Sequence, residues 1–517
     1  MNRSNGDPGD RSIGSASAGS DFLQLDIDDA PFGGRADWLA GELRRAISDG
    51  RLPLGSRLPA TRVLAAELRV SRGVVTEAYQ RLSEDGHVAG RGRNGTVVVA
   101  APALPVEPAR DPARRERPAV ATTTLPIGTS RLAAPEEVFT TPPGDDIFDL
   151  IRSAPARIDL SPGVPDLTAF PRAAWLRAER EVFAGLPASG FGYGDPRGTP
   201  ELRRAIAHWL ARNRGIRAEP DEVIVVAGTA QALALIGQVL RADGMAEIAV
   251  EDPGSLGVRQ HLRRQGLRTP PVSVDAEGVR VDELWAHRAV LLTPAHQFPT
   301  GVVLGGARRR ALMRWAADGG VIVEDDYDAE HRYDRPPVPA LRSMLPERVC
   351  YAGSVSKLLA PALRTGWVLA PPRHHDALVS AKRFADLGNA ALPQLVLARL
   401  MESGELERHL RLLRRRHRRR RDAMITAIRD HLPDAVVHGA AAGLHLLITF
   451  EGGRGPTWTD TDLAAACLAR GVKTHPLSWH RHRPGGPPGL LLGYAASPAT
   501  AIAEGVTAIG EALRDLH

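Results

Sequence analysis

The stretch GSVSKLLAPALRTG, residues 353–366, places a lysine directly after a short apolar segment and among small hydroxyl side chains. A lysine amine in such a position can form a Schiff base with an aldehyde cofactor. The hydroxyls of Ser354 and Ser356 and the guanidinium of Arg364 could then bind the phosphate group of that cofactor. Alone, this stretch is weak evidence, because a lysine on the protein surface is the ordinary alternative for Lys357.

A second stretch, VIVEDDYDAEHRY at residues 321–333, ends an apolar strand with acidic side chains. A buried carboxylate is costly unless it has a partner. If the aldehyde cofactor contains a pyridine ring, its protonated nitrogen would be such a partner for Asp325. The hydroxyl of Tyr327 could then hold an oxygen on the same ring. The alternative is a Mg²⁺ or Ca²⁺ site built from the four acids between residues 324 and 328. Adjacent strand residues point to opposite faces, so these acids do not converge easily and we predict no metal site.

A third stretch, AGTAQALALIGQVL at residues 227–240, follows the apolar run EVIVV and opens a helix. The backbone N–H groups of Gly228, Thr229 and Ala230 would lie at the N-terminus of that helix, where phosphate groups bind readily. The pattern is not specific by itself, but its position after a strand favours a phosphate-binding role.

Strands and helices alternate from about residue 148 onward. The predicted strands are EVIVVA (222–227), EIAVED (247–252), AVLLTP (289–294), GVIVED (320–325) and RVCYAGS (348–354). This alternation predicts a mainly parallel β-sheet covered by helices. A later strand, GLHLLITF at 443–450, lies beyond a long arginine-rich helix and predicts a smaller C-terminal lobe.

Near the N-terminus, RLPATRVLAAELRVSRGVVTEAYQRL at residues 57–82 predicts two short helices joined by a tight turn. Thr61 and Ser71 are expected to cap these helices. Such a pair places its second helix in the major groove of DNA. Arg72, at the start of that helix, could bind guanine through two hydrogen bonds or bind a phosphate. The alternative is a helical adaptor that binds no DNA.

Further DNA contacts are expected on the same face and on a basic wing. Arg57 and Arg62 could bind phosphates. The loop RGRNGT (91–96) predicts a two-stranded wing whose Arg93 enters the minor groove. The complete set of predicted DNA-binding residues is Arg57, Arg62, Ser71, Arg72, Gly73, Thr76 and Arg93.

Composition limits the function classes. The chain has 517 residues, a net charge of +6, 43% hydrophobic and 24% charged residues, the balance of a globular protein, and the positive charge permits a polyanionic partner. With no long apolar run, we expect no membrane span, no secretory signal and a cytoplasmic protein. Two cysteines exclude a disulfide framework or a four-cysteine metal site, and both are expected to be buried apolar side chains.

The run RRRHRRRR at residues 414–421 has two interpretations. It could contact DNA, or it could be a solvated helix face that pairs with carboxylates, and we favour the second. The expected organisation is a disordered tail (1–35), a DNA-binding domain (36–100), a Pro/Ala-rich linker (101–147) and a large domain (148–517).

Residues 36–99 resemble the winged helix-turn-helix of the GntR family, and the region from 148 to the end resembles the aminotransferase-like domain of MocR-type GntR regulators. The shared text includes YGDPRGTPELRRAIAHWLARNRGI (193–216), EDPG (251–254), TPAHQFPTG (293–301), EDDYDAEHRY (324–333) and SVSKLLAPALRTGW (354–367). The implied fold is multidomain: an α/β winged helix-turn-helix followed by an α/β fold-type-I aminotransferase-like domain.

The resemblance implies pyridoxal 5′-phosphate as the cofactor and a homodimer with sites at its interface. By this resemblance Lys357 forms the internal aldimine, Asp325 pairs with the pyridine nitrogen and Tyr327 meets O3′. Tyr193 reaches the phosphate of the other subunit, and His296 lies near the ring. The expected cofactor-binding residues are Lys357, Asp325, Tyr327, Arg364, Ser354, Ser356, Gly228, Thr229, Ala230, Tyr193 and His296.

Several positions depart from the family pattern. Ser255 stands where an aromatic side chain usually stacks on the cofactor ring. Leu491 stands about where amino-acid aminotransferases place the arginine that binds the substrate carboxylate, so efficient transamination is not expected. In the helix-turn-helix, Arg69 replaces the usual turn glycine and Gly73 replaces a Thr or Asn, which puts the base preference in doubt.

We therefore predict a pyridoxal-phosphate-binding transcription regulator rather than an enzyme, although a residual transaminase half-reaction is compatible. It would sense pyridoxal phosphate, bind a double-stranded DNA operator and control vitamin B6 synthesis or salvage genes, as in the PdxR-like branch of the family. Three alternatives stay open: sensing of an amino acid or amine through an external aldimine, an active aminotransferase with an accessory DNA-binding domain, and a DNA-binding scaffold with a dead cofactor pocket.

Overall fold

The protein is described by a computed structural model that covers residues 25, 27, 30–31, 34–48, 51–84, 86–90, 95–99, 138–139, 142–333, 338–450 and 458–516. The chain divides into two compact units, Met1–Ile127 and Gly128–His517, and each is described by itself. Nearly all of the predicted N-terminal tail lies outside the described residues, as does the tip of the predicted wing. Within the covered ranges, no helix is long and apolar enough to cross a membrane.

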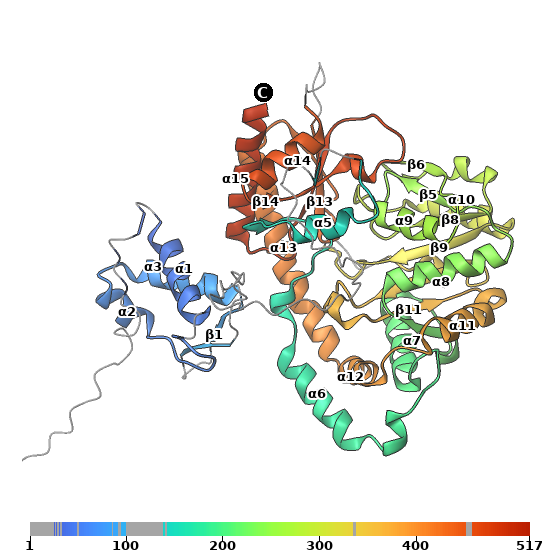
Figure 1. Cartoon of the computed structure of the whole chain (residues 1–517), viewed down its shortest axis with the longest axis horizontal. Coiled ribbons are helices and arrows are strands. Elements are labelled where there is room, and N and C mark those ends of the chain that lie inside the picture. The colour runs from blue at the N-terminus through green and yellow to red at the C-terminus, as the bar shows by residue number, and fades with distance from the viewer. Residues whose placement is uncertain are drawn as a thin grey trace, which may run out of the picture. The chain divides into compact units, whose positions relative to one another are not determined.

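Helices and a β-hairpin form the first unit, drawn in blue in Figure 1. Its elements are α1 (Arg35–Ser48), α2 (Thr61–Glu67), α3 (Arg72–Glu84), β1 (Val88–Gly90) and β2 (Thr96–Val98). Leu39, Leu43 and Ile47, at helical spacing on α1, are buried in one core with Val75 and Leu82 of α3. The predicted pair of short helices and the following hairpin are therefore confirmed.

The helix-turn-helix differs from the prediction at its first cap. Helix α2 begins at Thr61 itself, after Ala60, and no side chain caps it. The Thr61 hydroxyl instead accepts a hydrogen bond from Nε of Arg72 at 3.4 Å. Helix α3 begins directly after Ser71, as predicted. In the turn between the helices, Arg69 adopts a left-handed conformation with φ of 53°, which explains why glycine suits this position.

A large mixed sheet forms the centre of the second unit. Its strands are β4 (Val223–Val226), β5 (Ala249–Asp252), β6 (Pro271–Asp275), β7 (Gly278–Val279), β8 (Ala289–Leu292), β9 (Val321–Asp326), β10 (Val349–Ser354) and β11 (Gly366–Leu369). They lie in the order β4-β11-β10-β9-β8-β5-β6-β7. Neighbours from β10 to β6 pair in parallel, whereas β11 is antiparallel to both of its neighbours. The predicted strands and the mainly parallel sheet are confirmed, and β6, β7 and β11 are additions.

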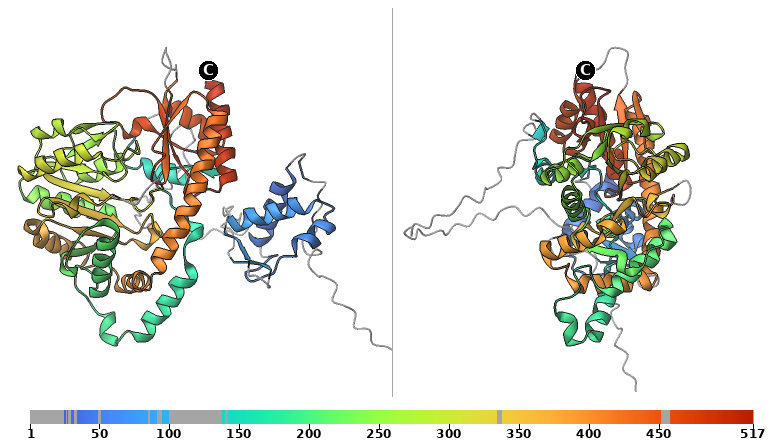
Figure 2. Two further views of the ribbon diagram at one scale, coloured as in Figure 1. Left: turned by 180° about the vertical axis from the view of Figure 1, so that it is seen from behind. Right: turned by 90° about the vertical axis from the view of Figure 1, so that its right-hand side faces the viewer.

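Helices cover both faces of this sheet (Figures 1 and 2). Helices α8 (Thr229–Ala242), α9 (Leu256–Arg264) and α11 (Pro372–Asp386) share one apolar cluster with side chains such as Val226 and Val323. The opposite face, with Val225 and Ile322, packs against α7 (Pro200–Arg214), α10 (Gly306–Ala317) and α12 (Ala391–Glu402). Burial on both faces explains why these strands are continuous apolar runs.

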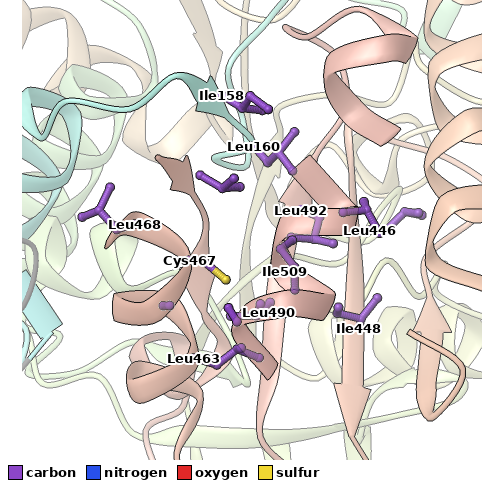
Figure 3. Close-up of a cluster of buried hydrophobic side chains, with 14 of the residues drawn as sticks. Ile158, Leu160, Leu446, Ile448, Leu463, Cys467, Leu468, Leu490, Leu492 and Ile509 are labelled. Atoms are coloured by element: carbon purple, nitrogen blue, oxygen red, sulfur yellow. The ribbon is translucent and has the colours of Figure 1, made fainter. Parts of the chain in front are cut away.

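A second, antiparallel sheet forms the smaller lobe. Its strands, in the order β12-β13-β16-β15, are β12 (Ala435–His438), β13 (His445–Phe450), β16 (Gly489–Gly493) and β15 (His475–Pro476). Figure 3 shows Leu446 of β13 and Leu490 of β16 pointing into the apolar cluster that contains Cys467. The predicted strand at 443–450 is confirmed. Both Cys467 and Cys350 are buried, and burial raises the pKa of each thiol to about 12.

Most of the remaining elements surround this smaller lobe, whereas α6 packs on α12. They are α5 (Ile147–Ser153), β3 (Ile158–Asp159), α6 (Arg172–Gly185), α13 (Glu405–His431), α14 (Asp460–Ala469), β14 (Val472–Lys473) and α15 (Ala499–Leu516). Strands β14 and β3 pair in parallel.

The second unit begins before the predicted boundary at residue 148. Val138 and Phe139 are buried in the core of the smaller lobe, and Phe139 stacks on Trp479 with ring centroids 5.3 Å apart. The last part of the predicted linker therefore packs on this unit, while residues 101–137 lie outside the described ranges.

The predicted arginine run lies on α13 and fastens it to neighbouring segments. Arg416 and Arg420 pair with the buried carboxylate of Asp166 at 2.8 and 2.9 Å. Arg414 and Arg418 donate to backbone carbonyl oxygens at 2.8 and 3.0 Å. The predicted pairing with carboxylates is present, but this helix face is not simply solvated, because several of its side chains bind the segments that follow β3 and β9.

Candidate cofactor site and DNA-binding face

Lys357 lies in the turn that follows β10, a central strand of the large sheet. Its amine donates a hydrogen bond to the carbonyl oxygen of Gly163, in the loop after β3. Burial lowers the pKa of this amine, while the nearby carboxylates of Asp328 and Asp325 act in the opposite direction. A lowered pKa favours the neutral amine, which is the nucleophilic form.

Asp325 lies on β9, in register with Ala352 of the neighbouring strand β10. Its side chain is buried, and Oδ1 has no hydrogen-bond partner in the part of the chain that the structure covers. Burial, reinforced by Asp326 and Asp328, raises the pKa of this carboxyl group to about 7. A cationic group placed against Oδ1 would relieve this cost.

The acids next to Asp325 along β9 make their contacts elsewhere. Glu324 accepts hydrogen bonds from two backbone N–H groups at 2.9 and 3.0 Å. Asp326 pairs with Arg214 at 2.6 Å, with both side chains buried. Because side chains alternate along a β-strand, Glu324 and Asp326 share one face, and Asp325, on the other face, interacts electrostatically with Lys357.

A hydrogen-bond network surrounds Tyr327. The Tyr327 hydroxyl and the Asp328 carboxylate each lie 2.9 Å from Nδ1 of the buried His296. The His296 ring packs so closely on Gly443 that an added Cβ there would come within 1.9 Å of it. The ligand atoms of His296, Asp328 and His445 lie within 4.8 Å of one another, which is also a spacing that can hold a metal ion.

The predicted phosphate seat forms where β4 meets α8. Gly228 is the N-cap of α8, with φ of 78°, and Thr229 and Ala230 follow it. The Arg364 guanidinium donates to the carbonyl oxygen of Ala227. It lies so close to Gly228 that an added Cβ would come within 3.2 Å of Nη1. A helix N-terminus beside a guanidinium suits a phosphate dianion.

These residues fit pyridoxal phosphate. The Lys357 amine suits its aldehyde, and the unpartnered oxygen of Asp325 suits its protonated pyridine nitrogen. Gly228 at the start of α8, and Arg364 beside it, suit its phosphate. Ser354 ends β10 as a buried residue, and its hydroxyl accepts the backbone N–H of Ser356 at 3.4 Å.

Leu491 belongs to a neutral wall of the smaller lobe. The Leu491 side chain of β16 is fully buried in a cluster with Leu447 and Leu477, against which Phe298 packs. In the sheet, Leu491 pairs with Leu447 and with His475. Burial lowers the pKa of His475 to about 4, so that its ring is uncharged near neutral pH. Packed apolar side chains and an uncharged ring therefore surround Leu491.

Ser255 has a structural role at its position. Its side chain caps α9 by accepting the backbone N–H of Val258 at 3.4 Å. The small Ser255 side chain therefore stabilises the start of a helix.

Tyr193 projects from the surface of the single chain. Its side chain is 96% exposed. It lines a hollow of about 550 Å³ together with Phe191, Leu387 and Asn389. Phe384 is also strongly exposed. The predicted contact of Tyr193 with the phosphate of a second subunit is untested in one chain.

The predicted DNA contacts of the first unit lie on its surface. Tyr79 donates to the carbonyl oxygen of Pro59 at 2.8 Å, which fixes α3 against the segment before α2. Arg57 packs over Gly95, at the base of the wing. Arg93 lies outside the described residues. The exposed residues of the predicted set are Arg57, Arg62, Ser71, Arg72, Gly73 and Thr76.

Sequence reasoning missed residues that shape the cofactor site. Gly163 gave a weak signal, a Pro-Gly turn after a short strand. His445 gave a better one, because it interrupts the apolar strand GLHLLITF. Lys382, which lies near the phosphate seat, gave none: its i,i+4 pair with Asp386 on α11 looks like an ordinary helix ion pair, and Gln231 is distant in sequence.

Family models and relatives agree on both units. The model of aminotransferase class I and II matches residues 156–483, and the model of bacterial regulatory proteins of the gntR family matches residues 36–98. The probable rhizopine catabolism regulatory protein MocR of Rhizobium meliloti is 31% identical over 92% of this chain and 93% of its own length. The pyridoxine biosynthesis transcriptional regulator PdxR of Corynebacterium glutamicum is 30% identical over 89% of this chain and 91% of its own.

A solved structure supports the fold and the cofactor. The α-aminoadipate aminotransferase LysN of Thermus thermophilus, complexed with N-(5′-phosphopyridoxyl)-L-leucine, matches with a TM-score of 0.64 and 28% identity. The match covers 71% of this chain and 94% of LysN. The chain therefore belongs to the MocR-type GntR transcription regulators, in which a GntR helix-turn-helix domain precedes a fold-type-I aminotransferase domain that takes pyridoxal phosphate as its cofactor.

Proposed function

We propose that this regulator senses pyridoxal phosphate itself and changes its binding to a DNA operator in response, without acting as an aminotransferase. The observation that carries this proposal is the packed position of Leu491. An amino acid bound beside Lys357 would place its carboxylate near apolar and uncharged side chains, at a cost of several kcal/mol. The cofactor is then the ligand that the site suits best.

The target genes follow from a relative. The Corynebacterium glutamicum protein, 30% identical to this chain, is named as a regulator of pyridoxine biosynthesis. We infer genes of vitamin B6 synthesis or salvage as the targets of this chain as well.

Each residue of the site has a proposed role. Pyridoxal phosphate supplies an aldehyde, which condenses with a primary amine to a C=N bond and releases water. Lys357 supplies that amine, Asp325 holds the proton on the pyridine nitrogen, and Tyr327, oriented by His296, donates toward the ring oxygen. The phosphate would be held by Arg364, Ser354, Ser356, Gly228, Thr229 and Ala230.

On the first unit, the exposed face of α3 would enter the major groove. Arg72 would read a base or clamp a phosphate, and Arg62 and Arg57 would bind phosphates. Ser71, Gly73 and Thr76 lie at the same helix start, and Arg93 is proposed for the minor groove.

A homodimer would give Tyr193 a function. The exposed aromatic and apolar side chains of Phe191, Phe384, Leu387 and Tyr193 form a surface that favours association with a second copy. Tyr193 would then reach the phosphate held by the partner chain.

The proposal is tested by titrating the purified protein with pyridoxal phosphate while measuring its visible absorbance and its affinity for DNA. The probe DNA is selected from random duplexes by the protein itself. A visible band together with a changed DNA affinity supports the sensor function. A band without any change in DNA affinity would remove pyridoxal phosphate as the effector.

A second titration separates the alternative effectors. Amines without a carboxylate and α-amino acids are added to the cofactor-loaded protein. Since Leu491 disfavours a carboxylate, amino acids should leave the visible band unchanged at concentrations where simple amines displace the Lys357 amine and shift that band. Bleaching by amino acids followed by release of a keto acid would instead identify an active aminotransferase.

A further inference from the structure

Lys382 is a second buried lysine close to the phosphate seat. The chain has three lysines, Lys357, Lys382 and Lys473. The Lys382 side chain, on α11, is fully buried. An isolated ammonium at such a place would be strongly unfavourable. Its partners therefore show what the lysine does.

The Lys382 amine is the centre of a polar network. It donates to both carboxylate oxygens of Asp386 at 2.7 and 2.5 Å, to Oε1 of Gln231 at 3.1 Å and to Oδ1 of Asn389 at 2.6 Å. Gln231 also donates to Asp386 at 2.7 Å. One ammonium thus joins side chains from α8, from α11 and from the segment after α11.

Two of these partners reach directly into the proposed phosphate seat. Oε1 of Gln231 accepts the backbone N–H of Ala227 at 2.7 Å, which fixes the approach to α8. Nδ2 of Asn389 donates to the carbonyl oxygen of Arg364 at 3.3 Å. Arg364 in turn holds a left-handed conformation with φ of 46° and binds the carbonyl oxygen of Ala227. Lys382 therefore connects both sides of the seat.

We propose that Lys382 is a positioning residue for the phosphate: it fixes the distance between the N-terminus of α8 and the Arg364 guanidinium. The proposal rests on the phosphate seat proposed above. The Lys382 ammonium is buried, whereas the carboxylate of its partner Asp386 is partly exposed. Such a pair adds little net stability, and the role that the contacts support is the geometry that Lys382 imposes on Gln231 and Asn389.

The test compares two aldehydes on the full-length protein. Pyridoxal phosphate and pyridoxal both present an aldehyde and a pyridine ring, but pyridoxal has no phosphate. The dissociation constant of each is measured by visible absorbance for the wild type and for Lys382→Met. We expect Lys382→Met to weaken pyridoxal phosphate binding on the order of tenfold, the effect of a misplaced charged hydrogen bond. The dissociation constant of pyridoxal should stay within about twofold of its wild-type value.

A matched control and a milder variant complete the design. Lys473→Met removes another buried lysine, on β14, whose amine donates to the carbonyl oxygen of Arg152 at 3.3 Å. This variant should leave the ratio of the two dissociation constants unchanged. Asn389→Ala cuts the link to Arg364 at a partly exposed position and serves as the test if Lys382→Met folds poorly. It should lower the ratio of the pyridoxal dissociation constant to the pyridoxal phosphate dissociation constant by a few-fold. Lys382→Arg should restore part of the phosphate preference.

Each outcome has a distinct meaning. Equal weakening of both aldehydes in Lys382→Met and in Asn389→Ala would show that the network supports folding only and would overturn the proposal. If the wild type itself binds pyridoxal as tightly as pyridoxal phosphate, the phosphate seat is wrong, whatever the variants do.

Discussion

The cofactor site and the DNA-binding face of this regulator place their polar groups in opposite environments. Lys357, Asp325 and Tyr327 lie in the interior of the second unit, where burial shifts their pKa values. On the first unit, Arg62 and Arg72 extend into solvent from short helices.

The difference shows how each surface would recognise its ligand. The cofactor site is fixed before its ligand arrives, so specificity depends on geometry and on the desolvation of a few groups. The DNA-binding face presents exposed cations, which gain energy by displacing counterions from phosphates. Binding of the cofactor should therefore depend on pH and little on salt, whereas binding of DNA should depend strongly on salt.

The largest expected effect comes from Lys357→Ala. Without this amine no covalent attachment is possible at the site, so the visible band of the cofactor should be absent at every concentration. Borohydride reduction followed by mass spectrometry would locate the attachment in the wild type. The DNA affinity of the cofactor-free variant should equal that of the cofactor-free wild type. A band of wild-type intensity in Lys357→Ala would mean that another amine carries the cofactor.

Asp325→Asn should weaken cofactor binding by about 10- to 100-fold, because it removes one charged hydrogen bond of about 1.5–3 kcal/mol. The same change should alter the stability of the cofactor-free protein. The carboxyl pKa is about 7 in the folded state and about 4 in an unfolded chain. The folded state therefore binds the extra proton, and stability falls as the pH rises from about 4 to about 7.

Removing that carboxyl should flatten the pH dependence of the free energy of unfolding between about pH 4 and about pH 7, by up to about 1.4 kcal/mol per pH unit. Denaturant unfolding of the cofactor-free proteins at several pH values provides the measurement. The buried Glu251, whose pKa burial also raises to about 7, contributes a slope of the same sign that remains in the variant. An unchanged slope in Asp325→Asn would contradict the assigned burial of this group.

On the other side of the comparison, Arg72→Ala and Arg62→Ala should differ in kind. Loss of a base contact by Arg72 should cost about 1–3 kcal/mol and relax the sequence preference at one position. Loss of a phosphate contact by Arg62 should weaken all duplexes alike and reduce the salt slope by about 1. Binding measured at several salt concentrations on selected and randomised duplexes distinguishes the two. If Arg72→Ala lowers only the salt slope, Arg72 is a phosphate contact.

The smallest effect is expected for Arg69→Gly. Arg69 has a φ of 53°, a conformation that costs a non-glycine residue about 1 kcal/mol, although glycine also gains entropy in the unfolded chain. The net stabilisation of the first unit should be about 0.5 kcal/mol. Calorimetry of the full chain can resolve it, because pyridoxal phosphate raises only the transition of the second unit. A destabilised variant would show that the Arg69 side chain makes a contact worth more than the strain.

Much of this fold was predictable because its signals are local. The continuous apolar strands predicted the buried sheet, and the turn between Leu68 and Ser71 predicted the helix-turn-helix. Asp325 was predictable in the same way, since an acid at the end of a buried strand demands a partner. The cap of α2 was not, because Thr61 meets Arg72 of the next helix rather than its own backbone.

The unpredicted parts of the site depend on contacts between distant segments. Gly163 and Lys357 are 194 residues apart, and Gln231 and Lys382 are 151 apart. No periodicity or spacing encodes such pairs. The arginine run shows the same limit: its sequence suggested a solvated face, and the position of Asp166 near it is a property of the folded chain.

The distribution of lysines has a consequence for the chain as a detector. Free pyridoxal phosphate modifies accessible amines of many proteins without specificity. Here Lys382 is 0% and Lys473 5% exposed, and both amines are engaged by oxygen acceptors, while every other basic side chain that is charged at neutral pH is an arginine. Such a chain exposes neither Lys382 nor Lys473 to the aldehyde that it would measure, so modification of its lysines should saturate at one cofactor per chain and report the supply of that aldehyde.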